Sequence, residues 1–190
     1  NELANEIPNG FQFNQFENPA NPEIHSKTTA KEIWEQSNHI IDGLVTGVGT
    51  GGTVTGCATY LKKVNPKCKI YAVEPKKSAV ISGCNPGSHS IQGIGAGFIP
   101  KVLKKELIDE ILTIDDDEAF YFGRLLAKKE GLLSGISSGA AIAATIKIAK
   151  RKELSGKRLV VILPSFGERY LSTAMFDNNT SIISREDGYL

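Results

Sequence analysis

Cysteine is scarce in this sequence, with three among 190 residues, at positions 57, 68 and 84. Three scattered cysteines are too few for a disulfide framework or a zinc site, so we expect reduced thiols in the cytoplasm or a reducing organelle. No stretch reaches the roughly 18 consecutive apolar residues that a membrane-spanning helix needs. The formal net charge of +1 gives no electrostatic reason to expect nucleic acid or an anionic membrane as a partner.

Short apolar runs rich in Val, Ile and Leu indicate buried parallel strands at 43–46, 69–74, 110–114 and 159–163. Helical patterns lie between and beside them, at 53–64, 115–130 and 138–152. The middle helix opens with Asp115 and has Glu118 three residues later, which is an acidic capping box. The alternation of strand and helix predicts an α/β fold built on a mostly parallel, doubly wound sheet.

The first 22 residues differ in composition from the rest. They are aromatic, rich in Asn and interrupted by Pro8, Pro19 and Pro22. We interpret residues 1–22 as a connector, residues 23–176 as one α/β domain, and the polar residues 177–190 as a surface tail.

A glycine-rich loop, Gly47-Val48-Gly49-Thr50-Gly51-Gly52-Thr53, follows the first predicted strand and precedes a predicted helix. Glycine lets a backbone approach an anion closely, and the helix offers free N–H groups and the positive end of its dipole. The hydroxyls of Thr50 and Thr53 can add donors. A phosphate group is the natural occupant of this loop.

Several phosphate compounds are compatible with the loop on its own. Gly47, Gly49 and Gly52 match the G-x-G-x-x-G pattern, and Glu74 ends the next strand 22 residues later, as in a dinucleotide-dependent oxidoreductase. Pyridoxal phosphate and a plain tight turn fit as well. A nucleoside triphosphate is disfavoured, because no lysine follows the glycines as the P-loop requires.

Ser165 lies just past the fourth predicted strand, at the edge of the sheet where ligands collect. Its hydroxyl could face a pyridine nitrogen as a neutral partner, which suits α,β-elimination chemistry, or it could be a helix N-cap. Two further glycine-rich stretches, 92–100 and 134–140, flank strand ends. We expect all of these segments to converge on one crevice.

Four motifs occur in order after an opening QFENPANPEIH at 15–25: GVGTGGT at 47–53, QGIGAGFIP at 92–100, GISSGAA at 135–141 and PSFGERYLST at 164–173. Together they resemble the cysteine synthase (O-acetylserine sulfhydrylase) family of fold-type II pyridoxal-phosphate enzymes, over nearly the whole chain. The resemblance implies pyridoxal 5′-phosphate (PLP) as cofactor and displaces the dinucleotide interpretation. It implies that residues 23–176 are the larger, C-terminal PLP-binding domain.

The resemblance also implies roles for single residues. Ser165 would be the partner of the pyridine nitrogen, Gln15 would help to hold the substrate carboxylate, and Gly93 would line the substrate side. The phosphate loop would consist of Gly49, Thr50, Gly51, Gly52 and Thr53.

Two family segments are absent from the sequence: the Ser-x-Lys-Asp-Arg segment with the Schiff-base lysine, and the Thr-Ser-Gly-Asn-Thr loop. We therefore expect a missing N-terminal half that carries both, no catalytic residue within 1–190, and no activity from these residues alone. For the complete protein, the resemblance implies a homodimer that makes L-cysteine from O-acetylserine and sulfide. The alternative is a non-catalytic partner that binds the C-terminal tail of serine acetyltransferase.

Overall fold

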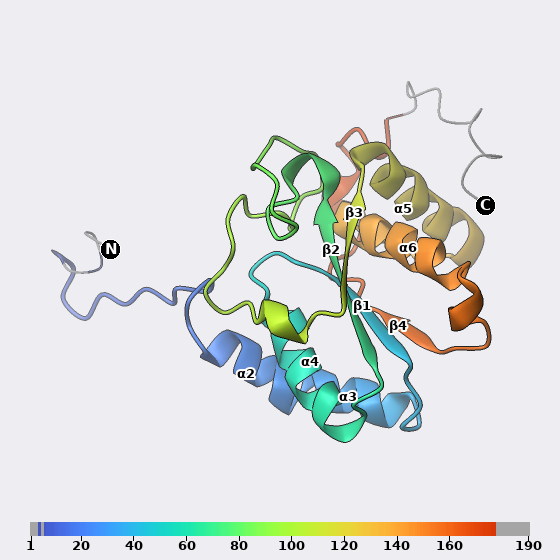
Figure 1. Cartoon of the computed structure of the whole chain (residues 1–190). Helices are drawn as coiled ribbons and strands as arrows, with labels where there is room; N and C mark the ends of the chain where they lie inside the picture. Colours follow the sequence, from blue (N-terminus) through green and yellow to red (C-terminus); the bar gives the residue numbers. More distant parts are fainter. Residues whose placement is uncertain (1–3, 5, 178–190) are drawn as a thin grey trace.

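The four predicted strands form one sheet in the computed structural model, which describes residue 4 and residues 6–177 (Figure 1). All neighbouring strands are parallel, in the order β3-β2-β1-β4. The strands are β1 (Gly43–Gly47), β2 (Lys69–Pro75), β3 (Glu110–Ile114) and β4 (Leu159–Val161). The predicted parallel α/β sheet is therefore confirmed.

Helices cover both faces of the sheet, as a doubly wound fold requires (Figure 1). One face carries α2 (Ala20–Lys27), α3 (Thr29–Gln36) and α4 (Gly52–Val64), and the other carries α5 (Asp116–Glu130) and α6 (Ile136–Ala149). Single 3₁₀ turns complete the described elements: η1 (Lys76–Ser78), η2 (Lys105–Leu107), η3 (Lys152–Leu154) and η4 (Glu168–Tyr170).

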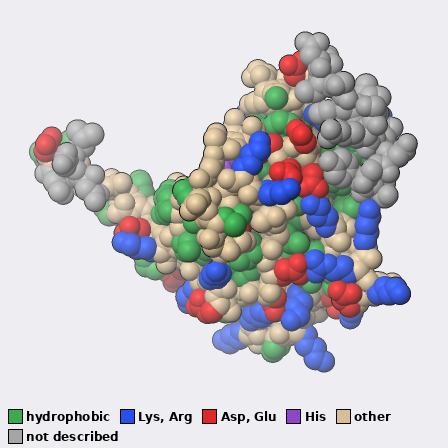
Figure 2. Space-filling model, turned by 45° about the horizontal axis from the view of Figure 1, so that its top comes forward, with side chains coloured by type: hydrophobic (Ala, Val, Ile, Leu, Met, Phe, Trp, Pro, Cys, Tyr) green, Lys and Arg blue, Asp and Glu red, His purple; other side chains and the backbone are tan. Residues whose placement is uncertain are grey.

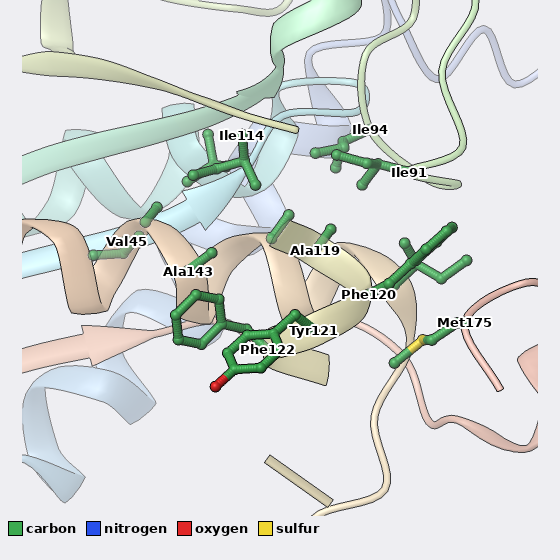
Figure 3. Packing of buried hydrophobic residues seen from close by; sticks show 14 of the residues in the cluster. Val45, Ile91, Ile94, Ile114, Ala119, Phe120, Tyr121, Phe122, Ala143 and Met175 are labelled. Carbon is green, nitrogen blue, oxygen red and sulfur yellow. The ribbon is translucent and has the colours of Figure 1, made fainter. Parts of the chain in front are cut away.

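Each face of the sheet has its own hydrophobic core, because side chains alternate across a strand. Leu44 and Ile70 belong to the core beneath α3 and α4. Val45 belongs to the other core, and Figure 3 shows it on the same side of the sheet as Ala143 of α6 and Phe122 of α5. The two cores fix the sheet between its helical layers and leave its carboxyl edge free to carry loops.

The capping box predicted for α5 is present. The Asp115 side chain accepts from the backbone at the third helical position, and the Asp115 N–H donates to the Glu118 carboxylate at 3.2 Å. Gly131 ends the helix in the left-handed conformation, with φ of 71°. Because both ends are set by local chemistry, the sequence located this helix to within one residue.

Helix α2 begins at Ala20, within the segment interpreted as a connector, and Pro22 fits in its first turn, where no backbone N–H bond is lost. Some predicted boundaries of strands and helices are wrong. Strand β4 ends at Val161, two residues earlier than predicted, and α6 runs from Ile136 to Ala149 instead of 138–152. The predicted tail lies outside the described residues except for Asp177.

Basic and acidic side chains are interleaved on the face seen in Figure 2. Ion pairs between them join separate elements, such as the bidentate pair of Arg151 with Glu110 at 2.7 Å. No helix among the described residues is long and apolar enough to cross a membrane. The same residues hold no group of His, Cys, Asp or Glu suited to a metal ion.

Candidate cofactor site

The glycine-rich segments predicted to converge do lie together at the carboxyl edge of the sheet. Loop 48–51 follows β1, and loop 92–100 lies in the long connection between β2 and β3. The Gly95 N–H donates to the Val48 carbonyl at 3.0 Å. A Cβ atom added to Gly49 would lie 2.5 Å from the Gly93 carbonyl oxygen, so the two loops touch through bare backbone.

The other two segments meet each other at the same edge. The Gly135 N–H, just before α6, donates to the Ser165 carbonyl at 2.8 Å. A Cβ on Gly135 would lie 2.6 Å from Ser165 Oγ. A Cβ on Gly93 would lie 3.8 Å from Ser137 Oγ, which places loop 92–100 beside the start of α6. Four chain segments thus border one site.

The loop before α4 presents a cradle of backbone donors. Gly51 has φ of +84°, a conformation that L side chains rarely adopt, and Gly52 is the first residue of α4. Among the described residues, the N–H groups of Gly49, Thr50, Gly51 and Thr53 have no hydrogen-bond acceptor. Free N–H groups at the start of a helix fit a phosphate, so this loop suits the phosphate end of PLP.

Helix α2 supplies partners for both threonine hydroxyls of the cradle. Asn21 Nδ2 donates to Thr50 Oγ1 at 3.0 Å, and His25 Nε2 lies 3.3 Å from Thr53 Oγ1. Burial lowers the pKa of His25 and so favours its neutral ring. Neither residue was predicted as part of the site, although the motif at 15–25 contains both.

Within the described part of the chain, the Ser165 hydroxyl has one hydrogen-bond partner, Tyr170, which was not predicted as a site residue. Its Oγ lies 3.1 Å from the hydroxyl of Tyr170, a residue that is 5% exposed. The residue before η4 is Gly167, and Ser165 caps no helix, so the N-cap interpretation is wrong. With Tyr170 donating to it, the Ser165 hydroxyl keeps its own hydrogen for a ligand.

Gln15 and Gly93 come from separate segments: Gln15 precedes α2, and Gly93 lies in loop 92–100. Gln15 lines an open groove with Phe16 and Phe98, whose rings meet edge to face at 5.0 Å. The Gln15 carbonyl accepts from Asn21 Nδ2 at 2.8 Å, which ties this residue to the cradle. Gly93 has φ of +94°, a backbone conformation that favours glycine.

Glu74, the acidic residue of the dinucleotide pattern, is 1% exposed. Its carboxylate accepts from the N–H groups of Ile81 and Ser82 at 2.9 and 3.0 Å, and from the Ser82 hydroxyl. Both carboxylate oxygens are thus engaged in holding the next loop. A ribose hydroxyl has no access to Glu74, and the spacing that resembled a dinucleotide site is structural.

No lysine stands in the desolvated setting that a nucleophilic amine needs. All lysines of the sequence lie in the described residues, and every one except Lys62 is exposed. Lys62 donates to the Asp109 carboxylate at 2.5 Å. Hydrogen bonds to aspartates raise the pKa of Lys69, Lys76 and Lys77 above the ordinary lysine value, which keeps these amines charged.

The loops at the carboxyl edge of the sheet, together with comparison with known families, define the class of protein. The family model described as pyridoxal-phosphate dependent enzyme matches residues 1–165, and the chain belongs to this family. Its members use PLP, so the sequence-based prediction of the cofactor is confirmed.

Similar curated proteins and solved structures narrow the resemblance to cysteine synthases. Cysteine synthase of Buchnera aphidicola from Acyrthosiphon pisum is 53% identical over 174 residues, 87% of this chain and 55% of that protein. Cysteine synthase A of Escherichia coli K12 is 51% identical over 85% of this chain and 53% of its own length. The crystal structure of cysteine synthase from Entamoeba histolytica matches with a TM-score of 0.89 and 48% identity, over 92% of this chain and 52% of that one.

The chain therefore spans about half the length of the curated relatives that it matches. Its fold is the one that fold-type II PLP enzymes share, and the family predicted from the motifs is confirmed.

Proposed function

We propose that these residues form the cofactor-gripping, C-terminal part of a cysteine synthase, which makes L-cysteine from O-acetylserine and sulfide. The observation that carries the proposal is that the cradle at 49–53 and Ser165 border the same edge of the sheet, linked by loop 92–100 and the start of α6. One end suits a phosphate and the other a ring nitrogen. When bound, PLP supplies an electron-withdrawing ring that lets an amino acid exchange its β-substituent.

In this proposal the cradle holds the phosphate. Backbone N–H groups of Gly49, Thr50, Gly51 and Thr53 would donate to it, and the two threonine hydroxyls would add donors. The positive end of the α4 dipole favours the dianion. The lack of side chains at Gly49 and Gly51 lets the loop pack closely against Gly93 and Leu103.

At the other end, the Ser165 hydroxyl, 3.1 Å from the Tyr170 hydroxyl, would donate to the ring nitrogen and accept from Tyr170. A neutral donor leaves the nitrogen mostly unprotonated. Gln15 and Gly93 border the place of the substrate, where we assign the Gln15 amide to the substrate carboxylate. The lysine bonded to the cofactor and the rest of the carboxylate site would belong to a preceding half.

Substitutions of Ser165 test the ring end. Ser165→Ala is expected to weaken cofactor binding by about two- to tenfold, the worth of one neutral hydrogen bond. Ser165→Asp should favour a protonated ring nitrogen and shift the absorption band of the bound cofactor. Tyr170→Phe, which keeps the Ser165 hydroxyl, should leave the band closer to the parent. Spectra of the alanine and aspartate variants identical to the parent would contradict the assignment.

The direct test of the proposed function is cysteine formation by the complete protein. Purified protein loaded with PLP is mixed with O-acetylserine and sulfide, and cysteine is measured. We expect sulfide-dependent formation of cysteine and none when O-acetylserine is replaced by serine. A protein that binds PLP but forms no cysteine would contradict the enzymatic proposal and favour a non-catalytic binding role.

A further inference from the structure

Helices α2 and α4 approach each other through two matched pairs of residues one turn apart. A Cβ on Gly52 would lie 1.8 Å from Asn21 Oδ1. A Cβ on Gly56 would lie 2.6 Å from His25 Cβ and 2.2 Å from the Pro22 carbonyl oxygen. The two glycines of α4 therefore form a notch in which α2 lies, with Asn21 and His25 over the start of α4.

The hydrogen bond from Asn21 helps to fill the acceptor positions of the Thr50 hydroxyl, so that this hydroxyl can act only as a donor. Thr50 Oγ1 accepts from Asn21 Nδ2 at 3.0 Å and from the Gly52 N–H at 3.2 Å. A hydroxyl oxygen has two acceptor positions, and both are then occupied. The remaining group, the O–H itself, can only donate.

His25 can likewise donate to the Thr53 hydroxyl, which leaves the hydrogen of that hydroxyl free for a ligand. Its Nδ1 lies 2.9 Å from the hydroxyl of Thr29, and its Nε2 lies 3.3 Å from Thr53 Oγ1. When Thr29 donates to Nδ1, the ring carries its hydrogen on Nε2 and donates to Thr53. The opposite tautomer would take the hydrogen of Thr53 and leave nothing to donate to an anion.

We propose that Asn21 and His25 are positioning residues that make the hydroxyls of Thr50 and Thr53 dedicated donors to the anion bound at the start of α4. The inference rests on the proposed function, in which that anion is the cofactor phosphate. The two residues act through the threonines and not by contact with the ligand. A bound phosphate selects the His25 tautomer with hydrogen on Nε2.

The test uses pyridoxamine 5′-phosphate, which carries the phosphate but no aldehyde, so that equilibrium dialysis of the complete protein reports non-covalent affinity. His25→Asn lacks a donor at the Nε2 position and should weaken binding about tenfold, a share of one hydrogen bond to a charged group. His25→Gln, whose amide nitrogen lies near the Nε2 position, should restore most of the affinity. His39→Gln is the matched control, because the His39 ring is exposed and contacts Glu35 and Trp34, away from the cradle.

A double-mutant cycle separates positioning from packing. In a Thr53→Val protein, His25→Asn should cause no further loss, because its effect passes through the missing hydroxyl. Equal losses with and without the Thr53 hydroxyl, or no loss at all from His25→Asn, would overturn the inference. Pyridoxamine, which has no phosphate, should bind the parent and the His25 variants alike.

Nitrogen-15 NMR of the histidines in the unsubstituted protein gives a second readout that needs no variant to fold. With pyridoxamine 5′-phosphate bound, the His25 ring should carry its hydrogen on Nε2, and hydrogen on Nδ1 alone would overturn the inference. Failure of the proposed function looks different: the parent would then bind pyridoxamine and its phosphate ester equally well.

Discussion

Gly51→Val is expected to abolish retention of PLP, with affinity lower by about a hundredfold or more, the loss of two or more hydrogen bonds to a charged phosphate. Gly51 has φ of +84°, where a β-branched residue is strained. A Cβ there would also lie 2.9 Å from Leu103 Cδ1 and 3.0 Å from Leu103 Cβ. Relief of either contact moves the N–H groups out of the cradle. Absorbance of the cofactor after gel filtration measures the effect.

Gly156→Val is the matched control for Gly51→Val. Gly156 precedes β4, has φ of +72° and has no atom within 4 Å of its would-be Cβ. The variant carries similar backbone strain, so its melting temperature should fall by a comparable amount, yet it should keep its PLP. Normal cofactor content in Gly51→Val, or equal loss of cofactor in both variants, would contradict the phosphate role of the loop.

The second large effect concerns the site of covalent attachment. Borohydride reduction of the complete, PLP-loaded protein followed by peptide mapping should place the cofactor on a lysine outside residues 1–190. An amine must be deprotonated and desolvated to attack an aldehyde, and the lysines described here are exposed or paired with carboxylates. Residues 1–190 alone should accordingly form no detectable cysteine.

Excess free PLP labels exposed amines weakly, so the mapping needs a control at one equivalent of cofactor. At that ratio no lysine of this segment should carry a stoichiometric adduct. Lys62 is the most informative single position, since it is the one lysine here that is partly buried. Lys62→Met should retain full covalent cofactor, and a stoichiometric adduct on Lys62 would refute the proposed division of the site.

Much of the sheet could be predicted because its signals are local. Buried parallel strands require short apolar runs, and all four are present near the predicted positions. Helix α5 carries its own capping box and terminal glycine. Helices α2 and α3 were not predicted, because each has only eight residues and prolines stand at the start of the first. Their positions depend on packing against α4, which no local pattern reveals.

The site was predicted unevenly for the same physical reason. The glycine loops could be recognised in the sequence, because close backbone contacts such as that between Gly49 and Gly93 exclude side chains. The hydrogen-bond partners could not be recognised, since their role depends on contacts formed only in the folded chain: these are Tyr170, Asn21 and His25. Glu74 gave a false signal of function. Its spacing from the glycines fits a dinucleotide site, but its side chain is buried and cannot reach a ligand.

The position of β4 in the sheet has a consequence for the order of folding. This strand pairs with β1, and the backbone N–H of Arg158 just before it donates to the side chain of Asp42, 116 residues earlier in the chain. Such distant pairing forms slowly, and during synthesis it must wait until almost the whole described chain has left the ribosome. The loop around Gly51 and the helices beside it are complete long before. We therefore expect a nascent chain to form the cradle for the phosphate first and to place Ser165, the proposed partner of the ring nitrogen, last.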